Sequence, residues 1–164
     1  MDTYNHFEYG EQLATQLKAI SHTEKDPHFF PAIEEEEFTS LENQISSQKG
    51  MTLIAIDGSN ADYQWQSENM TERPQYFFIL VTNTNSNCTE TIHQAQKSAR
   101  LIAQQIIARM INDCSKYQYG LSTLDLNSII IRGVGPLLDN FYGVLLGFNI
   151  LNSFNYELNP DYWL

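Results

Sequence analysis

One segment constrains the fold of this chain more than any other: from Thr89 to Cys114, apolar residues recur at helical spacing without a break. Such a broad stripe predicts one long amphipathic helix that packs its apolar side against another layer of the protein. Lys97, Arg100 and Arg109 lie off the stripe, on the side predicted to face solvent. The apolar positions are Ile92, Ala95, Ala99, Ile102, Ala103, Ile106, Met110 and Ile111.

Strands are predicted on the N-terminal side of this helix. Residues 51–56 form an apolar run closed by turn residues, and Tyr63 and Trp65 alternate with polar residues as in a short edge strand. A further strand is predicted over residues 75–82, in which residues 76–81 are continuously apolar, as is typical of a central strand covered on both faces. The intervening residues 67–74 are a predicted loop.

Two further strands are predicted after the helix, over residues 127–134 and 141–151. In the second of them, Val144, Leu146, Phe148 and Ile150 share one face. Residues 153–164 are rich in aromatic side chains but follow no regular period, and they are predicted to form an irregular C-terminal tail.

The first fifty residues contain two predicted helices. Residues 5–20 have an amphipathic pattern. A second, short helix is predicted from Phe38, Leu41 and Ile45 at helical spacing, and glutamates 34–37 would form its first turn. Residues 28–33 are apolar but contain Pro31, so they are expected to form an extended loop packed on the core.

The resulting order is α-α-β-β-α-β-β, with strands in adjacent pairs rather than alternating with helices. This order predicts an α+β fold in which an antiparallel or mixed sheet of about four strands has its helices packed on one face. A length of 164 residues and a hydrophobic content of 42% suit a single domain spanning residues 1–164. Within it, residues 22–50 are expected to be an insertion of a loop and a short helix, and residues 153–164 an aromatic tail.

The net charge of −11 is concentrated in the first half of the chain, where residues 1–75 carry 14 acidic and 4 basic side chains. Direct binding of nucleic acid is therefore not expected, because affinity for phosphates comes from clustered Lys and Arg. The apolar run at residues 144–148 is far too short to span a bilayer, as are the other apolar runs, and no secretion signal is evident. The expected location is the cytoplasm, or a virion assembled there.

The sequence contains no motif that predicts a catalytic, cofactor-binding or metal site. His6, His22, His28 and His93 have no metal-ligand spacing. The run 133–135 lacks the third glycine of a dinucleotide loop, and residues 57–68 do not fit a calcium loop, because Asp62 stands at the sixth position, where glycine is needed. The two cysteines are expected to be reduced thiols. We therefore expect a protein that is not an enzyme, although carboxylates that converge only in the folded chain stay an open alternative.

The aromatic residues indicate where a protein partner would bind. Tyr156, Tyr162 and Trp163 lie in the irregular tail, where they complete no strand or helix, and Tyr63 and Trp65 lie in the predicted edge strand. Aromatic side chains are enriched at the centres of protein interfaces, so these five residues are the candidate protein interface. The alternative is that the tail packs back on its own domain.

The order of elements, the acidic composition and the final long strand Phe141–Ile150 resemble the small tail-terminator, or tail-completion, proteins of tailed phages and prophages. The resemblance implies a non-enzymatic structural protein without cofactors, whose copies form a homo-oligomeric ring that caps a tail tube. The insertion at residues 22–47 and the aromatic tail depart from that pattern. The alternative function is an acidic binding protein, such as an immunity protein or inhibitor, that covers a basic partner protein.

Overall fold

The computed structural model describes residues 3–33, 38–45, 49–84, 88–138 and 140–163. The helices are α1 (His6–Gln16), α2 (Phe38–Ile45) and α3 (Thr89–Ser115), with 3-10 turns at Leu121–Thr123 and Pro160–Tyr162. The strands are β1 (Phe29–Ala32), β2 (Met51–Ile56), β3 (Ala61–Gln66), β4 (Asn69–Asn83), β5 (Leu124–Leu137), β6 (Phe141–Ile150) and β7 (Asn152–Phe154).

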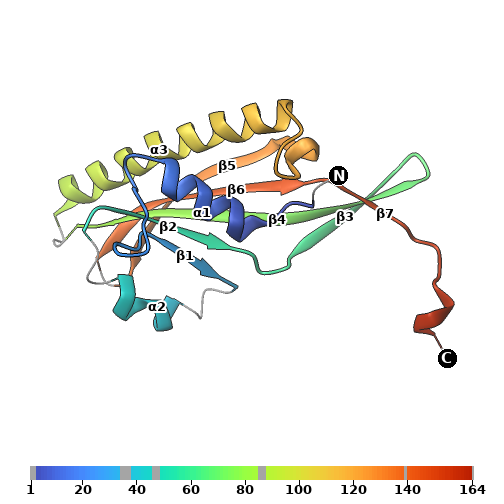
Figure 1. The fold of residues 1–164 in the computed structure, drawn as a ribbon, viewed down its shortest axis with the longest axis horizontal. Coiled ribbons are helices and arrows are strands. Elements are labelled where there is room, and N and C mark those ends of the chain that lie inside the picture. The colour runs from blue at the N-terminus through green and yellow to red at the C-terminus, as the bar shows by residue number, and fades with distance from the viewer. Residues whose placement is uncertain (1–2, 34–37, 46–48, 85–87, 139, 164) are drawn as a thin grey trace.

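The seven strands form a mixed sheet whose main path runs β1-β2-β4-β6-β5, with β3 and β7 both paired to β4 (Figure 1). β1 is parallel to β2, and the other pairs are antiparallel. The predicted α+β class is confirmed. The expectation of about four strands was too low, because β1 and β7 escaped the sequence pattern and the short edge strand predicted at Tyr63 and Trp65, which is β3, adds a further strand.

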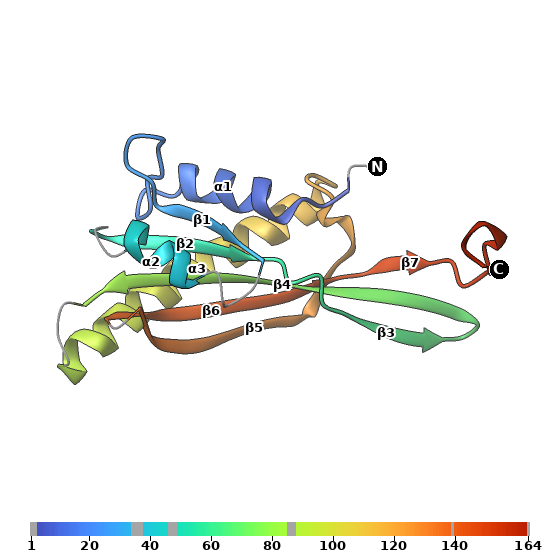
Figure 2. The same ribbon diagram turned by 90° about the horizontal axis from the view of Figure 1, so that it is seen from below.

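β4 is the longest strand, and it belongs to two parts of the sheet (Figure 2). Its residues 75–83 pair with β6 and residues 77–82 pair with β2, whereas residues 69–74 pair with β3 and residues 70–72 with β7. We call β3, residues 69–74 of β4 and β7 the arm, and the remaining sheet with α1, α2 and α3 the body. The arm extends beyond the helices at one end of the molecule, so no helix of the described chain covers it.

α1 and α3 pack on one face of the body. Phe78, Leu80 and Leu146 are fully buried there, beneath the alanine-rich stripe of α3 that includes Ala99 and Ala103. Small side chains on a helix let it approach a sheet closely, which keeps the interior densely packed. The sequence therefore placed the long helix correctly, as the cover of a sheet.

α2 packs on the other face, where Ile45 is fully buried against a second apolar cluster that includes Ile54 of β2. The expectation that all helices lie on one face is therefore wrong. The sequence of β2 explains why helices cover both faces. Leu53 and Ile54 point to opposite faces of the sheet and both are buried, so each face needs a covering layer.

Two further segments differ from the prediction in the first half of the chain. The expected loop at residues 28–33 contains β1, which extends the sheet beyond β2, so the insertion at residues 22–50 is part of the sheet. The expected loop at residues 67–74 is the turn and second strand of a hairpin. Glutamates 34–37 lie outside the described residues. α1 is shorter than expected and begins after Asn5, whose side chain accepts a hydrogen bond from the Glu8 amide (3.2 Å).

Candidate protein interface on the arm

The arm has two chemically different faces because side chains alternate along each strand. Register places Trp65, Met70 and Phe154 in one row across the three strands, with Tyr63 and Glu72 in the next row. The opposite face carries polar side chains, including Asp62, Gln64, Thr71, Arg73 and Ser153. One face of the arm is therefore aromatic and the other polar, as in a sheet with a single apolar side.

The aromatic side chains of the arm touch one another in pairs. The ring centroids of Tyr63 and Phe154 lie 5.3 Å apart with their planes at 72°, and those of Trp65 and Tyr156 lie 5.2 Å apart at 59°. These are favourable edge-to-face or tilted arrangements. The four rings are nevertheless between 39% and 56% exposed. We call these four residues the aromatic patch.

The phenol groups of the patch are bound within the arm. The Tyr63 hydroxyl donates to the Glu72 carboxylate (3.0 Å), and this bond raises the pKa of Tyr63. The Tyr156 hydroxyl donates to the backbone oxygen of Glu68 at the hairpin turn (3.1 Å), which ties the C-terminal segment to the arm. Both tyrosine hydroxyls of the patch are therefore already bonded within the protein.

The arm is anchored at the point along β4 where pairing with β2 and β6 ends and pairing with β3 and β7 begins. The Asn149 side-chain amide donates to the backbone oxygens of Arg73 (3.1 Å) and Pro74 (3.2 Å), which lie between the segments paired with β6 and with β7. Arg73 also forms an ion pair with Asp125 of β5 (3.4 Å). These bonds satisfy the backbone at the root and hold the arm in a defined direction.

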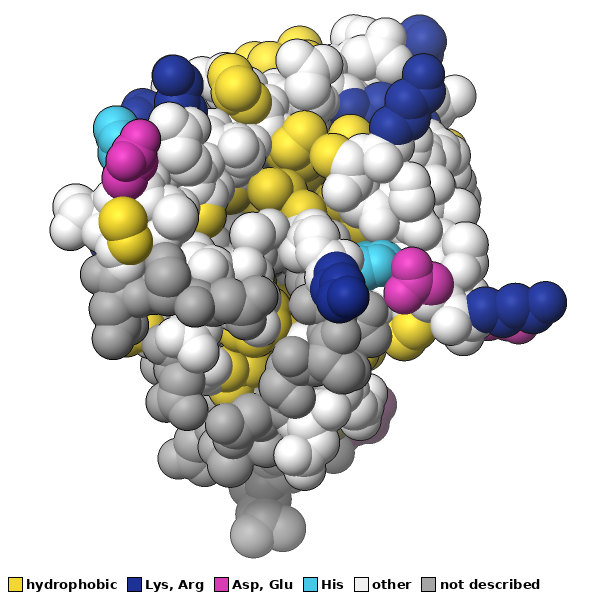
Figure 3. Space-filling view, turned by 90° about the vertical axis from the view of Figure 1, so that its left-hand side faces the viewer, with side chains coloured by type: hydrophobic (Ala, Val, Ile, Leu, Met, Phe, Trp, Pro, Cys, Tyr) yellow, Lys and Arg dark blue, Asp and Glu magenta, His cyan; other side chains and the backbone are white. Residues whose placement is uncertain are grey.

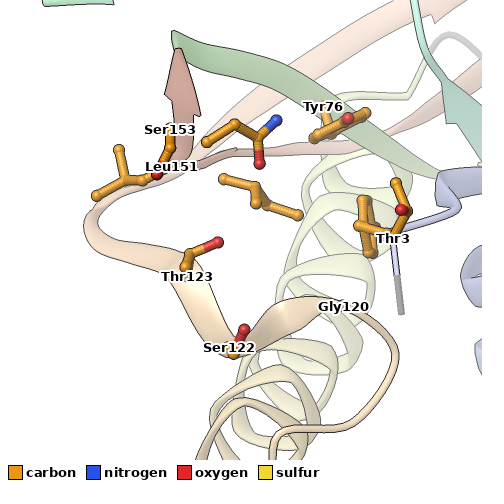
Figure 4. Close-up of a pocket in the computed structure, with 10 residues that line it drawn as sticks. Thr3, Tyr76, Gly120, Ser122, Thr123, Leu151 and Ser153 are labelled. Carbon is orange, nitrogen blue, oxygen red and sulfur yellow. The ribbon is translucent and has the colours of Figure 1, made fainter. Parts of the chain in front are cut away.

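A cavity of about 290 Å³ opens at the root of the arm. Figure 4 shows Thr3 and Tyr76 on one side of it, with Ser122 and Thr123 on another. Among the described residues that line it, the only ionisable side chains are Tyr4 and Tyr76, and burial raises the pKa of both. This part of the described chain therefore supplies no group that would exchange a proton near neutral pH.

His6 is buried in the body and is used in packing. Its Nε2 donates to the Phe77 backbone oxygen and its Nδ1 accepts from the Tyr4 hydroxyl, both at 2.9 Å, and its ring stacks on Phe78. Burial lowers the pKa of His6 to about 4, so the ring is neutral at pH 7.

Asp113, also buried, accepts hydrogen bonds from the Tyr9 hydroxyl (2.9 Å) and from Arg109 Nε (2.7 Å). This network joins α1 to α3. Among the described residues, no group of three or more His, Cys, Asp or Glu side chains is placed to hold a metal ion. Cys88 and Cys114 form no disulfide in the described chain.

The structure brings together three of the five residues predicted for the interface: Tyr63, Trp65 and Tyr156. Tyr162 and Trp163 lie farther along the tail, 84% and 68% exposed, and no ring contact joins them to the patch in the described chain. Sequence reasoning missed Phe154, which belongs to β7. No local pattern marks it, because the alternation of Phe148 and Ile150 breaks at the polar Asn152 before it reaches Phe154.

No helix in the described part of the chain is long and apolar enough to cross a membrane. Comparison with protein-family models, with curated proteins and with solved structures gave no match.

Proposed function

We propose that this protein is a non-enzymatic structural protein whose copies assemble into a homo-oligomeric ring, like the tail-terminator components of phages and phage-tail-like particles that its sequence resembles. The observation that carries the proposal is the aromatic patch of Tyr63, Trp65, Phe154 and Tyr156, which is held in place and yet exposed. Contiguous apolar surface on a folded protein typically marks a binding site.

The arm adds little to the folding of the body, which supports a role in binding. Its aromatic side chains face solvent, whereas the buried apolar clusters of the protein are built from body residues and the helices that cover them. A three-stranded sheet without a covering layer gains little from burial. An arm of this kind is better explained by a partner that covers it.

A protein partner fits the arm better than a nucleic acid does. Residues 61–74 and 152–163 contain five acidic side chains (Asp62, Glu68, Glu72, Glu157 and Asp161) and one basic side chain, Arg73. Phosphate groups would be repelled by this charge. Exposed tyrosine and tryptophan side chains are the residue types that most often anchor protein interfaces.

The test is the mass of the purified chain in solution, measured by size-exclusion chromatography with light scattering over a range of concentrations. We expect a defined oligomer, and we expect the double variant W65A/Y156A to be monomeric while its thermal unfolding stays close to that of the unmodified protein. Tyr117→Ala is the matched control, because Tyr117 is an exposed aromatic residue of the body.

A chain that stays monomeric at every concentration would contradict the proposal. The acidic binding protein would then be the better account, and the net charge of −11 would be its principal support.

A further inference from the structure

The two edges of the body sheet are protected to different degrees. β1 forms one edge, and it is short and contains Pro31, which are two common ways of preventing a sheet from adding strands. β5 forms the other edge, and its residues 130–134 pair regularly with β6 while no described strand pairs with their outer side. That segment contains no proline, although Pro136 follows it within β5, so residues 130–134 are the part of this edge left open to another chain.

A groove runs beside this open edge, between β5 and the N-terminal half of α3. It has a volume of about 300 Å³, and Ile131 and Val144 contribute apolar surface to it. His93, Lys97 and Arg100 of α3 also line it, and no acidic residue does. We call β5 and this groove the flank.

The part of the chain that contains the flank differs in charge from the rest of the protein. Residues 88–138, which comprise α3 and β5, contain five basic and three acidic side chains, a net charge of +2 in a chain of −11. The basic residues are Lys97, Arg100, Arg109, Lys116 and Arg132, and the acidic residues are Glu90, Asp113 and Asp125. The arm and its tail, with five acidic residues and one basic, have the opposite sign.

We propose that the arm of one copy packs on the flank of the next copy, so that assembly is head-to-tail. The aromatic patch would cover the apolar part of the groove, and the acidic residues of the arm and tail would face Lys97 and Arg100. This inference rests on the proposed function, since it names the surfaces through which the copies meet.

Charge favours this arrangement over the symmetric ones. Two arms packed face to face would bring like negative charges together, and two flanks would bring together like positive charges, both of which are unfavourable. Arm and flank are different surfaces of one chain, so every copy offers one of each. Head-to-tail contacts of this kind close into a ring when the rotation between copies permits it.

A second cavity lies at the end of the molecule opposite the arm. Figure 3 shows hydrophobic side chains gathered in a hollow at this end. The cavity between the end of β4 and the start of α3, about 480 Å³, is lined by Glu90 and by neutral residues such as Thr91 and Gln94. It offers no cation to an acidic arm, so the flank is the better site.

Sedimentation velocity on two variants tests the inference. The flank variant K97E/R100E reverses the charge of the groove, and the arm variant W65A/Y156A removes half of the aromatic patch. We expect each variant alone to be monomeric, and an equimolar mixture to form a 1:1 dimer. The mixture stops at the dimer because the intact arm of the flank variant binds the intact flank of the arm variant, and both remaining surfaces are defective.

The control is K25E/K116E, which changes the net charge equally on exposed lysines outside the groove, and it should assemble as the unmodified chain does. Far-ultraviolet circular dichroism establishes that each variant is folded. An unmodified chain that assembles, together with a flank variant that assembles equally well or a mixture that stays monomeric, would overturn the arm–flank contact and leave the proposed function standing. A monomeric unmodified chain would overturn both.

Discussion

The body and the arm share the strand β4, but the aromatic side chains on and beside this strand are buried in the body and exposed in the arm. Phe78 and Leu80 of β4 are fully buried between the sheet and its helices, whereas Trp65, opposite Met70 of the same strand, is more than half exposed. Both regions are rich in aromatic residues, so composition does not separate them. The difference arises because the helices end before the arm begins, which leaves the arm's aromatic residues without a covering helix in the described chain.

The largest expected effect comes from removing an aromatic ring in each region. Phe78→Ala should lower the free energy of unfolding by about 3–5 kcal/mol, because it leaves a cavity in the densely packed body. Trp65→Ala should change it by about 0.5 kcal/mol or less, as is usual for exposed positions. Urea denaturation measures both. A loss of about 3 kcal/mol in the arm variant would mean that the arm belongs to the cooperative core.

Acid should act on the body next, through His6. Its pKa is about 4 in the folded chain, below the ordinary value of 6.5, so between these pH values the unfolded chain binds a proton that the folded chain does not. The free energy of unfolding contributed by this site is therefore fully present above pH 6.5 and is lost as the pH falls towards 4, by about 3 kcal/mol in total.

The measurement is the midpoint of urea unfolding at a series of pH values. His6→Gln should flatten the dependence between pH 6.5 and 4, whereas His93→Gln, at an exposed position on α3, should leave it unchanged. An unaltered pH dependence in His6→Gln would show that another group causes the loss.

The helices and strands of the body were largely predictable from the sequence, because the spacing of their apolar residues follows which side chains are buried. The helix predicted over 89–114 is α3, and the strands predicted over 51–56 and 141–151 are β2 and β6 to within a residue. Each of these elements has apolar side chains that are buried against another layer. The spacing of these side chains along the sequence therefore indicates whether the element is a helix or a strand.

The arm was predictable only in part: the short edge strand predicted at Tyr63 and Trp65 is β3, whereas its hairpin turn, residues 69–74 of β4 and β7 were missed. The hairpin turn at Ser67 and Glu68 has φ angles of 44° and 72°, a left-handed turn that is usually marked by Asn or Gly, and neither is present here. β7 has three residues and pairs with a strand some eighty positions earlier, so no local pattern announces it. In the body, β1 was missed because Pro31 favoured a loop over a strand. Proline is nevertheless tolerated in a strand at the edge of a sheet.

The same pair of groups, a tyrosine hydroxyl and a carboxylate, occurs in both regions and allows a matched test. Tyr9 donates to buried Asp113 in the body, and Tyr63 donates to Glu72 in the arm. Asp113→Asn should lower the free energy of unfolding by about 2 kcal/mol, because it weakens buried bonds to a charged group. Glu72→Gln should change it by about 0.5 kcal/mol or less, since water replaces the bond. Equal effects in the two variants would remove the distinction between body and arm.

The smallest expected effect on stability comes from the tail. Truncation after Asn159 removes Tyr162 and Trp163, which are largely exposed, so thermal unfolding should stay within about 1 °C of the full chain. If these two residues are interface anchors, as the sequence predicted, the same truncation should abolish assembly in light scattering. Assembly that persists would confine the interface to the aromatic patch, because Tyr156 and its bond to Glu68 remain in the shortened chain. A lower unfolding temperature would instead mean that the tail packs on its own domain, and the boundary between body and arm would have to be redrawn.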